Sequence, residues 1–152
     1  MPKKSNDYLR LELTSKIHII SRKMAHFGLK RLAEEGMPNT KISVASLLLV
    51  LLETGDMTLT GIAKRLQMPH PTATVIADRL EEKGWLSRKQ GTDDRRNIYL
   101  HLTRSGKAAA LKVIKVRNTV IQEMCPGLDR KCMVAAIETL DKVLENMDSS
   151  FS

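Results

Sequence analysis

Apolar residues in the first quarter of the chain recur at helical spacing. From about Asp7 to Glu35 they fall mostly three or four positions apart, as Leu9, Leu13, Ile17, Ile20, Met24, Phe27 and Leu32. This spacing predicts one amphipathic helix, which the glycine and proline at positions 36 and 38 end. A helix of about 29 residues is long for a small domain. Its apolar stripe needs a surface to cover it, and a second copy of the chain is one such surface.

A buried helix is predicted next, followed by two shorter helices on either side of a tight turn. The segment 43–55, with Ser43 as its expected N-cap, is apolar on nearly all sides and should lie centrally. Thr58 then caps a helix over 59–66, and a further helix runs from about His70 to Lys83. Two short helices joined in this way form either a helix-turn-helix or an ordinary helical hairpin that packs into a core.

A pair of strands is predicted directly after these helices. Residues 85–89 are typical of a strand and residues 91–97 of a turn, and Ile98, Leu100 and Leu102 then alternate with polar positions, as in a strand with one buried face. A helix pair followed by such a hairpin is a winged helix-turn-helix, whose second helix enters the major groove. We expect the single tryptophan, Trp85, to be the packing anchor between helix and wing.

Two helices complete the predicted fold. Thr103 caps the first, which ends near Met124, and Asp129 caps the second, which ends near Asn146. The apolar positions of the first are Leu111, Ile114, Val120 and Ile121, with Val113, Val116 and Met124 beside them. Residues 148–152 are expected to be a disordered tail. The predicted fold class is therefore mainly α, with about six helices and a small β-hairpin wing.

The tip of the predicted hairpin carries the sequence Asp-Asp-Arg-Arg over residues 93–96. Residues two apart in an extended backbone share a face, so Asp94 can orient the guanidinium of Arg96 through charge-assisted bonds, and the first acid can orient Arg95. A hairpin beside a helix-turn-helix reaches the minor groove, whose concentrated negative potential suits arginine. The alternative is a solvated turn with an exposed ion pair worth about 0–1 kcal/mol. The position after the helix pair favours the DNA contact.

Composition favours a polyanionic partner and argues against several classes of protein. The net charge is +8, and neutralising phosphates with such charge drives binding to nucleic acid. No apolar run approaches the roughly 18 residues of a membrane span. The first residues lack the apolar stretch of a secretion signal, and two cysteines do not make a disulfide framework. These features together predict a cytoplasmic protein.

Two stretches resemble the multiple-antibiotic-resistance regulator (MarR) family. The pattern Asp94-x-Arg96-x-x-x-Leu100-x-Leu102-Thr103, followed by Ser105-Gly106, is similar to that family's wing. Residues 59–89, LTGIAKRLQMPHPTATVIADRLEEKGWLSRK, are similar to its helix-turn-helix. The resemblance implies a regulator, in most members a repressor, that binds pseudo-palindromic operators in double-stranded DNA as a homodimer. It also implies, in many members, a small-molecule effector that releases the DNA.

The resemblance further implies a division of the chain. Residues 1–40 and 104–147 are expected to form a helical dimerisation region in which two copies intertwine. Residues 41–103 are expected to form the winged helix-turn-helix lobe that binds DNA. This division would explain the long first helix. An effector site between the two regions cannot be assigned to particular residues from the sequence.

The predicted helix His70–Lys83 presents candidate DNA contacts on its outward face. Its inner stripe comprises Ala73, Ile76, Ala77 and Leu80. Thr72 and Thr74 can hydrogen-bond to base edges or phosphates, and Val75 can touch a thymine methyl group. Arg79 contacts a phosphate or pairs with an acid of the same helix. The family often has a polar or basic residue near Val75, which is itself apolar. We therefore expect few direct base contacts from this helix, and specificity that depends more on the wing and on DNA shape.

Three further candidates border this face. Pro69 offers no side-chain oxygen to the open N–H groups at the helix start, so His70 caps the helix, contacts a phosphate, or remains an exposed turn residue. Arg88 and Lys89 flank the wing. They hold the DNA backbone in one interpretation and are ordinary surface cations in the other.

Signals for other chemistry are weak. There is no phosphate-binding loop, nucleophile motif or H-E-x-x-H pattern, so we expect no enzyme, no cofactor and no metal. Cys125 and Cys132 flank the break between the last two helices and are either a redox switch or, as we favour, buried structural thiols. The thin polar readout at Val75 and Pro69 motivates an alternative function: a winged-helix protein-interaction module without specific DNA binding.

Overall fold

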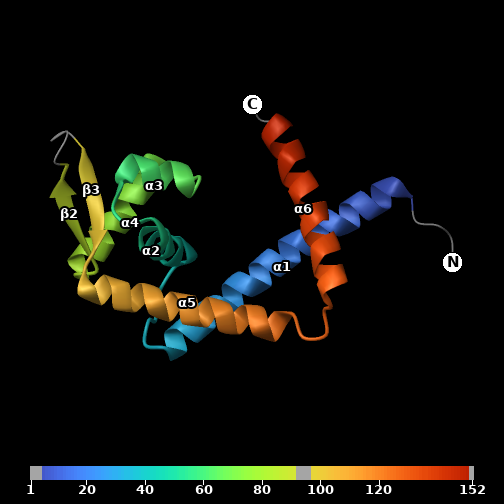
Figure 1. Cartoon of the computed structure of the whole chain (residues 1–152), viewed down its shortest axis with the longest axis horizontal. Coiled ribbons are helices and arrows are strands. Elements are labelled where there is room, and N and C mark those ends of the chain that lie inside the picture. The colour runs from blue at the N-terminus through green and yellow to red at the C-terminus, as the bar shows by residue number, and fades with distance from the viewer. Residues whose placement is uncertain (1–4, 92–96, 151–152) are drawn as a thin grey trace. The chain divides into compact units, whose positions relative to one another are not determined.

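The computed structural model describes residues 5–91 and 97–150 and is built from helices and a small sheet (Figure 1). The chain comprises two compact units, Met1–Val120 and Ile121–Ser152. The first holds helices α1–α4, the sheet and most of α5, and the second holds the end of α5 and α6. This architecture confirms the predicted fold class. None of the described helices combines the length and apolarity needed to cross a bilayer.

The first helix, α1, spans Asn6–Glu34, which confirms the predicted long helix. Ser5 caps it, because its hydroxyl oxygen accepts a hydrogen bond from the Tyr8 N–H at 3.3 Å. Leu32 is the one residue of α1 that is buried. The other apolar residues of the predicted stripe are exposed or half-buried within this single chain. The stripe is therefore left without a covering surface.

Helix α2, Ile42–Thr54, forms the centre of the first unit (Figure 1). Leu47 and Leu48 are completely buried, which confirms the predicted central position. The expected N-cap was wrong: the helix begins at Ile42 with Lys41 as N-cap and no side-chain capping bond, so Ser43 lies inside the first turn. A serine cap is worth about 1 kcal/mol. Burying one leucine contributes about 1.5–3 kcal/mol, so the buried leucines stabilise α2 more than a serine cap would.

The predicted helix-turn-helix is formed by α3, Leu59–Arg65, and α4, His70–Glu82. Thr58 caps α3 as predicted, since its hydroxyl accepts a backbone N–H of the first turn at 3.2 Å. The turn is closed by a hydrogen bond from the Met68 N–H to the Ala63 carbonyl at 3.0 Å. The predicted inner stripe of α4 is buried, as Ala73, Ile76, Ala77 and Leu80. The opposite face of α4 is therefore presented outward.

The wing is an antiparallel sheet in the order β1-β3-β2. Its strands are β1, Met57–Thr58, β2, Leu86–Gln90, and β3, Ile98–Leu102. The predicted hairpin is confirmed, but β1 was missed because two residues are too short to show a strand period. Leu100 and Leu102 are buried, whereas Ile98 is 50% exposed. The buried face predicted for β3 is therefore present only in the half of the strand that contains Leu100 and Leu102.

Four hydrogen bonds form the root of the wing, where β3 passes into α5, Arg104–Met124. The hydroxyls of Thr103 and Ser105 both donate to the Gly84 carbonyl, at 2.6 and 2.7 Å. The Thr103 N–H donates to the Trp85 carbonyl at 3.1 Å. The Thr103 hydroxyl oxygen accepts the Gly106 N–H at 3.1 Å, which confirms it as the cap of α5. These contacts join the end of α4, the start of β2 and the start of α5.

Trp85 anchors this junction, as predicted. It is half-buried and packs against the core. The backbone N–H of Trp85 donates to the Leu80 carbonyl at 2.8 Å, and the Lys83 ammonium lies 5.0 Å from the centroid of the Trp85 ring. Trp85 thus ties the last turn of α4 to the first residue of β2.

The buried face of α5 matches the predicted apolar positions in part. It consists of Gly106, Ala109, Ala110, Val113, Val116 and Val120, of which the three valines were predicted. Leu111 and Ile121, also predicted as apolar positions of this helix, are exposed, Leu111 by 58%. Small side chains let α5 approach the core closely, so the helix buries its alanine and valine face. Its larger apolar residues consequently form a second, uncovered face.

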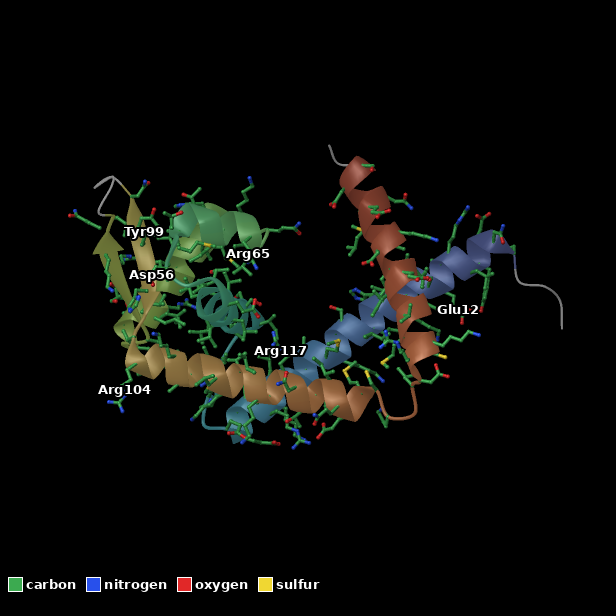
Figure 2. All side chains as sticks on the ribbon, in the orientation of Figure 1. Glu12, Asp56, Arg65, Tyr99, Arg104 and Arg117 are labelled. Atoms are coloured by element: carbon green, nitrogen blue, oxygen red, sulfur yellow. The ribbon has the colours of Figure 1, made fainter. Side chains whose placement is uncertain are left out.

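Ion pairs fasten α5 to the ends of α1 and α2. The Lys112 ammonium donates to the Glu35 carbonyl at 3.0 Å, and Lys115 pairs with the Glu35 carboxylate at 2.7 Å. The hydrogen bond and the charge of Lys115 lower the pKa of Glu35. Arg117 pairs with Glu53 at the end of α2 at 3.4 Å (Figure 2). The C-terminal ends of both helices therefore face lysine or arginine, the charge that stabilises a helix end.

In the second unit, α6 spans Arg130–Ser150. Asp129 caps it as predicted, accepting the N–H of Cys132 at 2.7 Å, and this bond lowers the pKa of Asp129. The helix continues to Ser150, past the expected end near Asn146. Residues 151 and 152 of the expected tail lie outside the described residues.

The two cysteines are not buried thiols in this single chain. Cys125 is half-buried and Cys132 is exposed, and both are free. Cys132 lies in the first turn of α6, all of which is exposed. The expectation of buried structural thiols was therefore wrong for the isolated chain.

Gly106→Ala is expected to destabilise the first unit strongly. A Cβ at this position would lie 1.9 Å from the Trp85 carbonyl oxygen and 3.2 Å from a methyl of Leu102. The root of the wing would have to shift, and overpacking of this kind costs about 1–3 kcal/mol or more. Urea unfolding followed by circular dichroism measures the loss.

Gly28→Ala is the matched control, because a Cβ there meets nothing within 4 Å. Alanine is favoured over glycine inside a helix by about 1 kcal/mol, so this variant should be at least as stable as the parent. Equal stability of the two variants would contradict the close approach at Gly106.

Candidate nucleic-acid interface

The outward face of α4 has a stripe of three exposed side chains, which we call the α4 stripe: Thr72, Val75 and Arg79. They are three and four residues apart and therefore lie above one another on the helix. In the described part of the chain, neither the Thr72 hydroxyl nor the Arg79 guanidinium has a hydrogen-bond or ion-pair partner. Val75 is 48% exposed. The stripe thus offers a hydroxyl, two methyl groups and a guanidinium.

Thr74, also predicted to contact DNA, is already hydrogen-bonded. Its side chain is half-buried, and its hydroxyl donates to the His70 carbonyl four residues earlier, at 3.0 Å. A hydroxyl has one proton. Thr74 can therefore accept a further hydrogen bond but has no proton left to donate.

The first turn of α4 has few free backbone donors. Pro69 is the N-cap, and it makes no side-chain capping bond, as its chemistry predicts. Its carbonyl accepts the Ala73 N–H at 3.1 Å. Pro71 removes another N–H, which leaves those of His70 and Thr72 open at this helix end. His70 is exposed and does not cap the helix.

Arg88 is the side chain whose surroundings differ most from the sequence-based expectation. From β2 its guanidinium bonds the Asp78 carboxylate and reaches the Glu81 carboxylate at 2.8 Å. These acids stand on α4, and the hydrogen bond to Asp78 is the main cause of the raised pKa of Arg88. Arg88 therefore braces the wing against α4 and neutralises two carboxylates beside the α4 stripe. No residue pattern pointed to this pairing across ten positions of chain.

The same pairing decides between the two interpretations of Arg79. An ion pair with Asp78 or Glu82 was one of them, but Asp78 is bonded by Arg88, and Arg79 pairs with neither acid. Arg79 is exposed. Its guanidinium is consequently available to an external anion.

The wing contributes Lys89 and a loop. Lys89 is exposed on β2 opposite Tyr99 of β3. The loop closes at its base, where the Gly91 N–H donates to the Asn97 carbonyl at 2.8 Å. The predicted contacts Arg95 and Arg96 and the orienting Asp94 lie outside the described residues.

A second polar contact ties the sheet together and was not predicted. His101 Nδ1 of β3 lies 2.5 Å from Asp56 Oδ1, directly before β1 (Figure 2). The two residues are 45 positions apart, and only the pairing of β1 with β3 brings them together. Among the residues with described positions, no group of three or more His, Cys, Asp or Glu could hold a metal ion.

A double-mutant cycle of Arg88→Ala and Asp78→Ala should give a coupling free energy of unfolding of about 0.2–1 kcal/mol. The value is modest because these side chains stay 35% and 47% exposed. The coupling should fall when salt is raised, since exposed charges are screened. Urea unfolding at low and high salt measures both effects. The control cycle pairs Arg79→Ala with Asp78→Ala, which should show no coupling because adjacent helix residues do not face each other. Equal coupling in both cycles would contradict the role of the Arg88–Asp78 ion pair in holding the wing against α4.

Comparison with known proteins finds relatives with the same type of fold. Residues 43–98 match the model of the MarR family. The transcriptional repressor MdtR of Bacillus subtilis is 26% identical over 142 residues, which cover 93% of this chain and 90% of the repressor. A structure of reduced AbfR bound to DNA is 26% identical with a TM-score of 0.68, covering 91% of this chain and 94% of that one. Streptococcus pneumoniae FabT shares the fold at 18% identity and a TM-score of 0.82, covering 92% and 98%. With the helix-turn-helix and wing described above, these likenesses show that the chain is similar to proteins of the MarR family, with the family match covering residues 43–98.

Proposed function

We propose that this chain is a DNA-binding transcriptional regulator, acting as a repressor that occupies a pseudo-palindromic operator as a homodimer. The observation that carries the proposal is the α4 stripe, which is exposed and unpartnered on the second helix of a winged helix-turn-helix. Two relatives support it: MdtR is named a repressor, and AbfR was solved on DNA. No described side-chain arrangement suggests an enzyme.

In the proposed complex α4 enters the major groove and the wing reaches the adjacent minor groove. Thr72, Val75 and Arg79 face base edges, and Thr74 and His70 lie against the backbone. Lys89 holds a phosphate beside the wing, and Arg95 and Arg96 enter the minor groove with Asp94 orienting them. The net charge of +8 supplies attraction to the duplex. Arg88, predicted as a phosphate contact, acts here by holding the wing against α4.

Dimerisation is the second part of the proposal, with residues 1–40 and 104–147 forming the interface and 41–103 the DNA-binding lobe. Its support is the uncovered apolar surface of the single chain. On α6, Met133, Ile137, Leu140, Leu144 and Met147 are all exposed. They repeat at alternating steps of four and three, which is the seam pattern of packed helices. A second copy would cover this seam and the exposed stripe of α1.

A small-molecule effector that releases the DNA remains part of the family expectation. The site is left unassigned. Aromatic residues make up 3% of the chain. A pocket based on aromatic stacking is thus disfavoured.

Selection of bound sites from random duplexes at defined salt tests the function directly. We expect an inverted repeat with half-sites about 10 base pairs apart, mirroring the dimer. Affinity should fall by about 10³-fold between roughly 50 and 200 mM salt if about six phosphates are contacted. Arg96→Ala should weaken binding to the selected duplex, whereas Lys142→Ala on α6, which removes the same charge, should not. A flat salt response on every duplex would favour the protein-interaction module instead.

Ile137→Glu is expected to abolish the dimer. The change puts a charge into the α6 seam, and a buried unpaired charge costs several kcal/mol, so the dissociation constant should rise at least about 100-fold. Sedimentation equilibrium distinguishes a chain of 17.1 kDa from a pair. Thr139→Glu adds the same charge to α6 off the seam and should leave the pair intact. If both variants stay dimeric, α6 does not form the interface.

A further inference from the structure

The exposed valine of α4 is unusual for a helix that reads DNA. Val75 does not belong to the hydrophobic core, and nearly half of its surface is open. It lies between Thr72 and Arg79 in the α4 stripe. Both neighbours carry free polar groups suited to phosphates or base edges. An apolar side chain at the centre of a polar stripe calls for an apolar partner.

Other groups on this face that could select a base by hydrogen bonding are already in use. The Thr74 hydroxyl donates to the His70 carbonyl, so it cannot donate to a base. The Asp78 carboxylate, which could accept from a cytosine amino group, is bonded by Arg88. Thr74 can still accept a hydrogen bond from a base, but the donors and the apolar surface left for direct reading on this face belong to the α4 stripe.

The dimensions of the α4 stripe fit a short run of base pairs. Seven residues of helix separate Thr72 from Arg79, a rise of about 10 Å. Base pairs are about 3.4 Å apart, so the stripe spans roughly three of them. Val75 therefore faces a central pair, with a polar contact on either side.

We propose that Val75 reads the C5 methyl group of a thymine, so that each half-site requires a pyrimidine methyl at its centre. In the major groove the thymine methyl is the only apolar group that a base pair presents. Cytosine has a hydrogen at the same position. The inference rests on the proposed function and specifies the chemistry that α4 recognises.

Removing one methyl from such a contact should weaken binding about fourfold per half-site, from the usual value of a buried methylene. If Val75 makes the contact, this loss of affinity should be absent when Val75 is replaced. Deoxyuridine is the ideal probe, since it differs from thymidine only by this methyl and leaves every hydrogen-bonding group in place.

The experiment uses the duplex recovered by site selection, resynthesised with deoxyuridine at each thymidine in turn. For the parent protein, one position in each half-site should show the fourfold loss. Val75→Ala should bind the unmodified duplex more weakly and lose nothing further at that position. Replacing that thymine–adenine pair by cytosine–guanine should weaken the parent protein, and 5-methylcytosine should restore part of the loss.

Ile42→Ala is the control, because Ile42 is a similarly exposed aliphatic residue on α2, 44% open. It should bind every duplex as the parent does. Thermal melting checks that Val75→Ala still folds, as the exposure of Val75 leads us to expect. Equal uracil sensitivity in the parent and Val75→Ala, or none at any position, would overturn the inference while leaving DNA binding intact. Failure to select any duplex would instead overturn the proposed function.

Discussion

The arrangement of the helix-turn-helix and the wing depends on the carbonyl of Gly84. It accepts two hydroxyls, from Thr103 and Ser105, while the next carbonyl, that of Trp85, accepts the Thr103 N–H. Gly106 has no side chain because the Trp85 carbonyl occupies the space where its Cβ would stand. One short cluster thus fixes the end of α4, the first strand of the hairpin and the start of α5. The relative placement of reading helix and wing follows from it.

The ion pairs of Arg88 form a second connection between the hairpin and α4. It joins β2 to α4 through two carboxylates, both of which would otherwise repel phosphates. The pair is partly exposed, so its effect on stability is small. Its larger consequence is electrostatic, because it leaves the outward face of α4 with a free guanidinium and no free acid at position 78. Arg88, which the sequence suggested as a phosphate contact, is thus bonded to carboxylates of its own chain.

Much of this structure was predictable from local patterns, and the failures have a common cause. The caps Thr58, Thr103 and Asp129 and the inner stripe of α4 depend on residues within one or two turns, which spacing reveals. Strand β1, the Asp56–His101 contact and the Arg88 brace depend on residues brought together by the fold, which spacing cannot reveal. The buried face of α5 was predicted only in part for a related reason. The predicted valines are buried, but close packing also selects Gly106 and two alanines and leaves Leu111 exposed.

Affinity and specificity then have different sources in the proposed complex. Attraction comes from net positive charge and from cations such as Lys89, which contact phosphates without regard to sequence. Direct reading by α4 rests mainly on one hydroxyl, one guanidinium and one apolar side chain. Few base contacts mean that much of the discrimination must come from groove shape, sensed by the wing. It also means that the single apolar contact carries more of the base selectivity than it would on a helix rich in polar readers.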